Sequence, residues 1–206
     1  MPQDPINIGS DRLLLCEGKT TLLVLGPFCR KLGIQGFQPL DFGSKDNFGN
    51  FIQDVTILPG FESQVHTVAV VRDAEDDAMA AFASVRQALL AAHLPTPHAP
   101  GEIAQDGRRV GVFIMPDNET PGMIETLCMS SVDSDPAFPC IQQFFDCVVD
   151  HMGEPPANMH KARAQAFLAT RHDVDYHVGR AADAGVWNFN HVAFAPLENF
   201  LRRLAA

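Results

Sequence analysis

The hydrophobic positions of the chain fall into short continuous runs separated by segments of helical periodicity. Residues 13–16, 37–42, 68–71 and 109–115 form the short runs, and the valine-rich run at 68–71 is typical of a strand buried on both faces of a parallel sheet. Helical patterns at 20–32, 47–58 and 78–94 follow the first three runs. A strand followed by a helix, repeated three times, predicts an α/β fold with a central, mostly parallel sheet flanked by helices.

The helical segments differ in strength. The segment at 78–94 is the clearest, and its apolar face is expected to comprise Met79, Phe82, Val85, Leu89 and Leu90. Pro27 is expected to kink or restart the helix at 20–32.

The second half of the chain is predicted to be mostly helical. Residues 102–107 are expected to form the turn region of a hairpin, and further helices are expected at 122–127, 141–150, 161–170 and 196–204. We therefore predict a single domain over residues 1–206, with a core at about 11–130 and a C-terminal helical extension at about 138–206.

Acidic residues follow two of the predicted strands. Four carboxylates come within five positions after the run at 68–71, namely those of Asp73, Glu75, Asp76 and Asp77, and Glu17 follows the first run. The carboxyl ends of parallel strands form the crevice where α/β sheets bind ligands, and carboxylates this close repel one another unless a cation lies among them. Hard carboxylate oxygens suit Mg²⁺ or Mn²⁺, so these acids are candidate metal ligands. Alternatively, Asp76 and Asp77 only complement the positive end of the helix that follows.

Two further acids and a lysine are expected at the same edge. Asp117 and Glu125 follow the strand at 109–115 and are additional candidate metal ligands. Each has a structural alternative, because Asp117 could cap the next helix and Glu125 could lie on its exposed face. Lys45 lies on a predicted loop, where its ammonium could contact a phosphate, although a surface lysine is the common alternative.

Composition restricts the classes of function. The net charge of −10 argues against a broad basic surface for nucleic acid, so such contact would need metal ions or a basic partner. Five cysteines without a CxxC pair favour a reduced cytoplasmic compartment and argue against a thiolate zinc site. The first ten residues lack the features of a signal peptide, and no apolar run is long enough to span a membrane.

Several ordered motifs carry a family resemblance. The segments CEGKT, GSKDN, VVRDAEDD and VGVFIMPDN, followed by PGMIETL, KARAQAFLA and FAPLENFL, resemble a Toprim-related bacterial family of unknown function. More broadly, Glu17 after one strand and Asp73-Ala74-Glu75 after another are similar to the Toprim domains of topoisomerases, primases and OLD-family nucleases. The resemblance implies a Toprim-like, Rossmann-type core that binds one or two Mg²⁺ ions through Glu17, Asp73 and Glu75.

The chain departs from the Toprim pattern at two places. Thr21 stands where many relatives carry a second acid, and Glu75 stands where they carry an aspartate. Glu125 is a candidate substitute ligand. Tyr176 is the single tyrosine and lies far down the tail, so the tyrosine-based mechanism of topoisomerases is not expected.

Two functions follow from the resemblance. The first is a metal-dependent phosphodiesterase that acts on DNA or RNA, with Glu17, Lys45, Asp73 and Glu75 as catalytic residues. The second is a Toprim-derived binding or regulatory module that works through a protein partner. A basic groove would favour the first, and an exposed apolar patch around Trp187 or Phe194 would favour the second.

Overall fold

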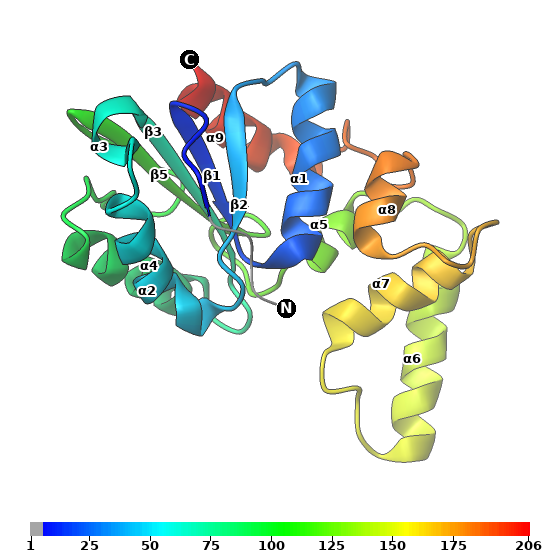
Figure 1. Ribbon diagram of the computed structural model, residues 1–206. Coiled ribbons are helices and arrows are strands. Elements are labelled where there is room, and N and C mark those ends of the chain that lie inside the picture. Colours follow the sequence, from blue (N-terminus) through cyan, green and yellow to red (C-terminus); the bar gives the residue numbers. More distant parts are fainter. Residues whose placement is uncertain (1–5) are drawn as a thin grey trace.

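A five-stranded sheet forms the centre of the molecule (Figure 1). The computed structural model describes residues 6–206. The strand order is β2-β1-β3-β5-β4, and the strands are β1 (Arg12–Cys16), β2 (Phe37–Asp41), β3 (Thr67–Asp73), β4 (Ile103–Asp106) and β5 (Arg108–Met115). Strands β2, β1, β3 and β5 are parallel, whereas β4 is antiparallel to β5 at the edge. The predicted α/β fold with a mostly parallel sheet is confirmed.

Helices cover both faces of this sheet. In chain order they are α1 (Gly18–Leu32), α2 (Phe48–Thr56), α3 (Phe61–Gln64), α4 (Ala78–Ala91), α5 (Ile124–Ser130), α6 (Phe138–Met152), α7 (Met159–Ala169), α8 (Val178–Asp183) and α9 (Ala195–Ala205). Helices α2, α3 and α4 pack on one face, and α1 and α9 pack on the other. Alternate residues of one strand serve the two faces: Leu14 and Cys16 point toward α1, and Leu13 and Leu15 point the opposite way.

The last helix of the chain returns to the sheet. Phe200 of α9 lies against Phe113 of β5, with ring centroids 5.4 Å apart. The close approach of α9 is possible because Gly111 has no side chain, and a Cβ there would lie 2.8 Å from the Phe200 ring. Helices α6 and α7 instead project away from the sheet (Figure 1). The segment predicted as an extension therefore includes one helix that covers the sheet.

Three local expectations need correction. Met79 and Leu90 are 59% and 51% exposed, because the buried face of α4 comprises Ala78, Ala81, Phe82, Val85 and Leu89 instead. Pro27 does not restart the helix, because α1 is continuous from Gly18 to Leu32.

The third concerns residues 102–107, predicted as the turn region of a hairpin. The hairpin is present, but residues 103–106 already belong to its first strand, β4, which pairs with β5. The turn itself needs only Gly107, whose positive φ of 67° lets the chain reverse between the two strands.

No helix among residues 6–206 combines the length and the apolar character needed to cross a membrane. The prediction that the chain carries no signal peptide rests partly on residues 1–5, which lie outside the described residues.

Candidate functional site

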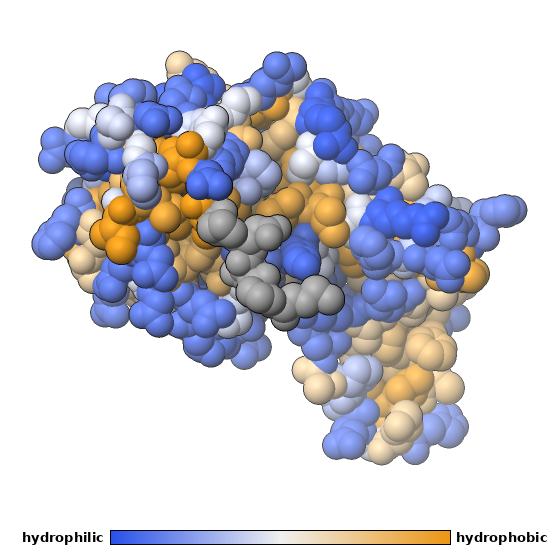
Figure 2. Space-filling view, viewed as in Figure 1, coloured by the Kyte–Doolittle hydropathy of each residue, from blue (hydrophilic) through white to orange (hydrophobic). Residues whose placement is uncertain are grey.

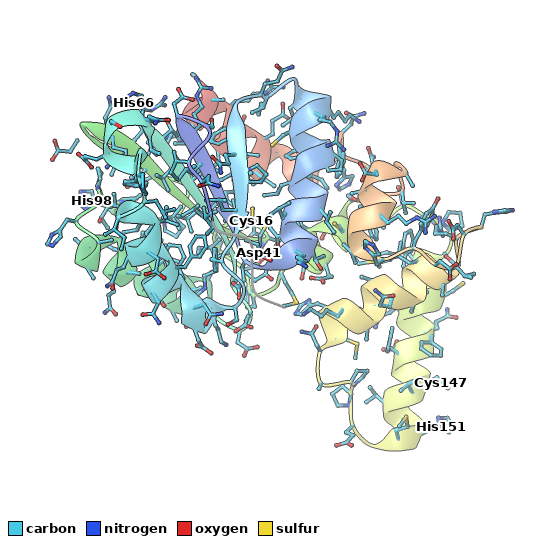
Figure 3. The ribbon with its side chains drawn as sticks, viewed as in Figure 1. Cys16, Asp41, His66, His98, Cys147 and His151 are labelled. Carbon is cyan, nitrogen blue, oxygen red and sulfur yellow. The ribbon has the colours of Figure 1, made fainter. Side chains whose placement is uncertain are left out.

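The chain changes direction across the sheet at β1. It leaves β1 through α1 to β2 on one side, and then returns to β3 on the other side of β1. Such a switch opens a crevice at the carboxyl ends of the two central strands, since the connections leave in opposite directions. Figure 3 labels Cys16 and Asp41, the last residues of β1 and β2, and so marks this edge. Glu17 follows β1 and Asp73 ends β3, so the prediction that these acids end neighbouring strands is confirmed.

Glu17 is held at the crevice by its neighbours on β3. Its Oε2 accepts a hydrogen bond from the backbone N–H of Asp73 at 3.3 Å, and the Nε of Arg72 lies 3.6 Å from the same oxygen. The Glu17 and Arg72 side chains are only 12% and 8% exposed. Burial raises the pKa of Glu17, and the Arg72 guanidinium opposes that rise. Glu17 is thus a largely buried carboxylate with one nearby counter-charge.

Asp73 faces two other carboxylates. Its Oδ1 accepts a hydrogen bond from the backbone N–H of Ile124, at the start of α5, at 3.0 Å. Burial raises the pKa of Asp73 well above its ordinary value, and the negative charges of Glu17 and Glu125 raise it further. Asp73, at the end of β3, is therefore influenced by one acid that follows β1 and by one acid in α5.

Glu125 is the most deeply buried of these acids. It is 4% exposed, which rules out the exposed helix face considered for it. Its Oε2 is buried without a hydrogen-bond partner. Burial raises the pKa of Glu125, while Lys161 and His160 of α7 lower it. A carboxylate oxygen left without a donor is a costly arrangement, and a bound cation would relieve it.

Glu75 and Lys45 form an ion pair at the rim. Glu75 has a left-handed backbone with φ of 55°, fixed by two backbone hydrogen bonds with Gly122 at 2.9 and 2.8 Å. Its Oε2 contacts the Nζ of Lys45, which lies in the short 3₁₀ helix η1 (Lys45–Asn47). Both side chains are partly exposed, so the pair can open to solvent at low cost.

The remaining two candidate ligands have structural roles. Asp77 precedes α4 and accepts a hydrogen bond from the backbone N–H of Ala80 at 2.9 Å, as in the helix-start alternative. Asp117 accepts hydrogen bonds from the backbone N–H groups of Glu119 and Thr120 and from the Thr120 hydroxyl. Burial acts to raise the pKa of Asp117, but these hydrogen bonds outweigh burial and lower the pKa. Asp117 therefore stabilises the turn after β5 and does not cap the next helix, because α5 begins at Ile124 with Met123 at its N-cap.

The donor set suits a hard cation. Glu17, Asp73, Glu75 and Glu125 supply only carboxylate oxygens, and the unpaired Glu125 oxygen marks where positive charge is wanted. These side chains do not form a complete metal site, because no group of three His, Cys, Asp or Glu residues within residues 6–206 is arranged to hold a metal ion. Thr21 is buried in α1.

A cleft of about 460 Å³ adjoins these acids. One wall contains Lys45, Glu75 and Asp76, and the other is the segment at 155–160 that leads into α7. The lining carries both signs of charge, so the cleft is not a basic groove.

Comparison with known proteins identifies the family. The sequence of residues 11–206 matches the family described as "Protein of unknown function (DUF3226)". The chain belongs to this family.

A solved structure shows the same fold. The DUF3226 chain is similar to the C-terminal region of the Burkholderia pseudomallei OLD protein, with a TM-score of 0.53 and 13% identity over 97% of this chain and 100% of the other. The C-terminal region of the Xanthomonas campestris pv. campestris OLD protein gives a TM-score of 0.49 and 11% identity over 95% and 96% of the two chains. No curated protein matches the sequence.

The structure of this DUF3226 chain adds three residues that the sequence analysis missed. Arg72 contacts Glu17, and a charged residue inside a valine-rich strand was a signal that could have revealed it. His160 and Lys161 act on Glu125 from α7. Nothing local in the sequence marks these two, because they reach the site only through the packing of α7 on α5.

Proposed function

We propose that this chain is a Toprim-type, metal-dependent phosphodiesterase that acts on DNA or RNA. The observation that carries the proposal is the buried, unpaired oxygen of Glu125 beside Asp73, at the switch point of the sheet. The likeness of fold to the C-terminal region of an OLD protein supports it.

Four carboxylates would hold the metal, which we propose to be Mg²⁺ or Mn²⁺. They belong to Glu17, Asp73, Glu75 and Glu125. When bound, such an ion would stabilise negative charge on a phosphoryl oxygen and lower the pKa of a bound water.

The other residues of the site orient and balance these acids. Arg72 fixes the position of the Glu17 carboxylate, and the Ile124 N–H fixes that of Asp73. The Lys45 ammonium lies at the mouth of the cleft, where it would bind a phosphate oxygen of the substrate after leaving Glu75. Because the chain as a whole carries a charge of −10, this local positive charge and the metal would have to supply most of the attraction for a polyanion.

A second candidate is a non-catalytic Toprim-derived module that acts through a protein partner. Two ion pairs favour it, since Arg72 already neutralises Glu17 and Lys45 already neutralises Glu75. The projecting arm of α6 and α7 also exposes hydrophobic side chains, including Phe144 and Met152 (Figure 2). The patch once considered around Trp187 and Phe194 is not available, because both are buried in the core.

One pair of measurements separates these functions. Mg²⁺ and Mn²⁺ are titrated calorimetrically into the wild type, Asp73→Asn and the control Asp54→Asn, which removes an exposed carboxylate on α2. The same proteins are then incubated with plasmid DNA, single-stranded DNA and RNA. The phosphodiesterase proposal expects metal binding and cleavage by the wild type and Asp54→Asn, and neither by Asp73→Asn.

Three other results of these two measurements would contradict the phosphodiesterase proposal or part of it. Metal binding that depends on Asp73, without cleavage of any substrate, supports the binding module. Failure of the wild type to bind either metal rules out the metal site, and cleavage that survives in Asp73→Asn rules out its catalytic role.

A further inference from the structure

A second cavity lies between α5, α6 and α7, apart from the carboxylates of the proposed metal site. Its volume is about 140 Å³. Met129, Phe138 and Ile141 give it an apolar wall, and Arg163 and His160 of α7 supply its polar side. A cavity of about 150 Å³ accommodates one benzene ring, so this one has room for a single small ring or a branched aliphatic group.

Arg163 is the unusual residue of this cavity. Its Nε is buried and has no hydrogen-bond partner among the described residues. Arg171, just beyond the C-terminal end of α7, shows the ordinary arrangement, since its guanidinium binds Asp135 at 2.8 Å. The charges that act on the nearby Glu125 come from Lys161 and His160, so Arg163 is not balanced by that acid. The Arg163 guanidinium thus lines a partly apolar cavity and has no acceptor among the described residues, an arrangement suited to an anion.

We propose that this cavity binds a small carboxylate that carries one aromatic ring or a branched aliphatic body. The apolar walls would cover the body, and the planar guanidinium of Arg163 would bind the carboxylate through two parallel hydrogen bonds. A carboxylate with an apolar body would contact both the apolar wall and the Arg163 guanidinium. An inorganic anion would use only the guanidinium, and a neutral ring would use only the apolar wall.

The site has a structural connection to the cleft beside the carboxylates. His160 lines both the cavity and the cleft. The Thr126 hydroxyl accepts a hydrogen bond from the backbone N–H of Met123 at 3.0 Å, and its oxygen lies within hydrogen-bond distance, 2.9 Å, of the Nδ1 of His160. A ligand in the cavity would therefore touch a side chain that also forms the wall of the cleft.

Benzoate is the probe for this site, measured by titration into ¹⁵N-labelled full chain with backbone amide shifts as the readout. We expect saturable shifts confined to α5, α6 and α7. Acetate, which lacks the ring, and benzyl alcohol, which lacks the charge, should each bind at least about tenfold more weakly. Arg163→Gln should weaken benzoate binding by at least about tenfold.

The chain offers a matched control. Arg86 on α4 also has a buried Nε without a partner, but it lies on the other side of the sheet and lines none of this cavity. Arg86→Gln should leave benzoate affinity unchanged. If Arg163→Gln does not fold, Ser130→Trp decides the matter, because it places a large side chain at an exposed position of the cavity wall and keeps Arg163.

Three results would overturn the proposal. They are the absence of saturable benzoate shifts in the wild type up to about 10 mM, shifts centred outside α5, α6 and α7, and unchanged affinity in a folded Arg163→Gln or Ser130→Trp protein. None of them depends on metal binding or cleavage, so this site and the proposed phosphodiesterase activity stand or fall separately.

Discussion

Replacing Glu125 by methionine should stabilise the protein while removing a proposed metal ligand. The Glu125 side chain is 4% exposed, and its Oε2 has no hydrogen-bond partner. An unsatisfied buried polar atom costs about 1–3 kcal/mol, and the nearby charge of Asp73 adds repulsion. Methionine has a similar length and no charge, and the buried Cys128 lies near Glu125 on the same helix. We expect Glu125→Met to raise the free energy of unfolding by about 1–3 kcal/mol at pH 7.

The stability of Glu125→Met relative to the wild type should increase as pH rises. Burial raises the pKa of Glu125 in the folded protein above its ordinary value of 4.5. Just above pH 4.5, therefore, Glu125 is still protonated in the folded wild type but already ionised in the unfolded chain. The wild type therefore loses stability as pH rises through this window, and the variant lacks that loss. The advantage of Glu125→Met should be small near pH 4 and should grow toward pH 7.

Urea unfolding followed by fluorescence provides the assay, because the protein has a single tryptophan, Trp187, and it is buried. Glu119→Met, which changes an exposed acid at the same edge of the sheet, is the control and should alter stability by less than about 0.5 kcal/mol. A Glu125→Met protein that is less stable than the wild type at pH 7, or whose advantage does not change with pH, would refute the reasoning. Unchanged Mg²⁺ affinity in a folded variant would remove Glu125 from the proposed ligands.

Three further changes test the packing and electrostatics of the fold. Gly111→Ala should destabilise the protein by about 1–3 kcal/mol in urea unfolding, because the new Cβ would lie 2.8 Å from the Phe200 ring. Trp187→Ala should lower the free energy of unfolding, followed by circular dichroism, by about 3–5 kcal/mol. The change leaves a cavity in the core and removes the hydrogen bond from the indole N–H to the Val178 carbonyl at 2.9 Å. Arg171→Gln should lower the free energy of unfolding by about 1–2 kcal/mol at pH 7. This loss should shrink in unfolding curves below pH 3.8, because Arg171 lowers the pKa of Asp135 and the stabilisation disappears as Asp135 is protonated.

Each of these has a contrary outcome. An unchanged stability of Gly111→Ala would mean that α9 does not pack closely on β5. A loss below about 1 kcal/mol for Trp187→Ala would place the indole outside the core. A cost of Arg171→Gln that stays constant between pH 7 and pH 3 would show that the ion pair with Asp135 does not contribute.

Local features of the sequence were enough to predict the sheet and its acidic edge. The pattern of valines in β3 marks a strand buried on both faces, since helices cover the sheet on both sides and consecutive side chains point to opposite faces. Glu17 and Asp73 come together because parallel strands end at a common edge, which follows from connectivity alone. The capping role of Asp77 was also within reach, as it depends only on residues three positions away.

Contacts between distant segments decided the rest. Which face of α4 is buried depends on where α2 and the sheet lie, and so Met79 and Leu90 are exposed despite their apolar character. The burial of Glu125 depends on α7, which packs on α5 from more than thirty residues further along the chain. Arg163 likewise lines a cavity only because three helices meet around it. A sequence pattern shows only which residues are neighbours along the chain. The pKa of a carboxylate and the cavity beside a guanidinium depend on residues that tertiary packing brings close in space.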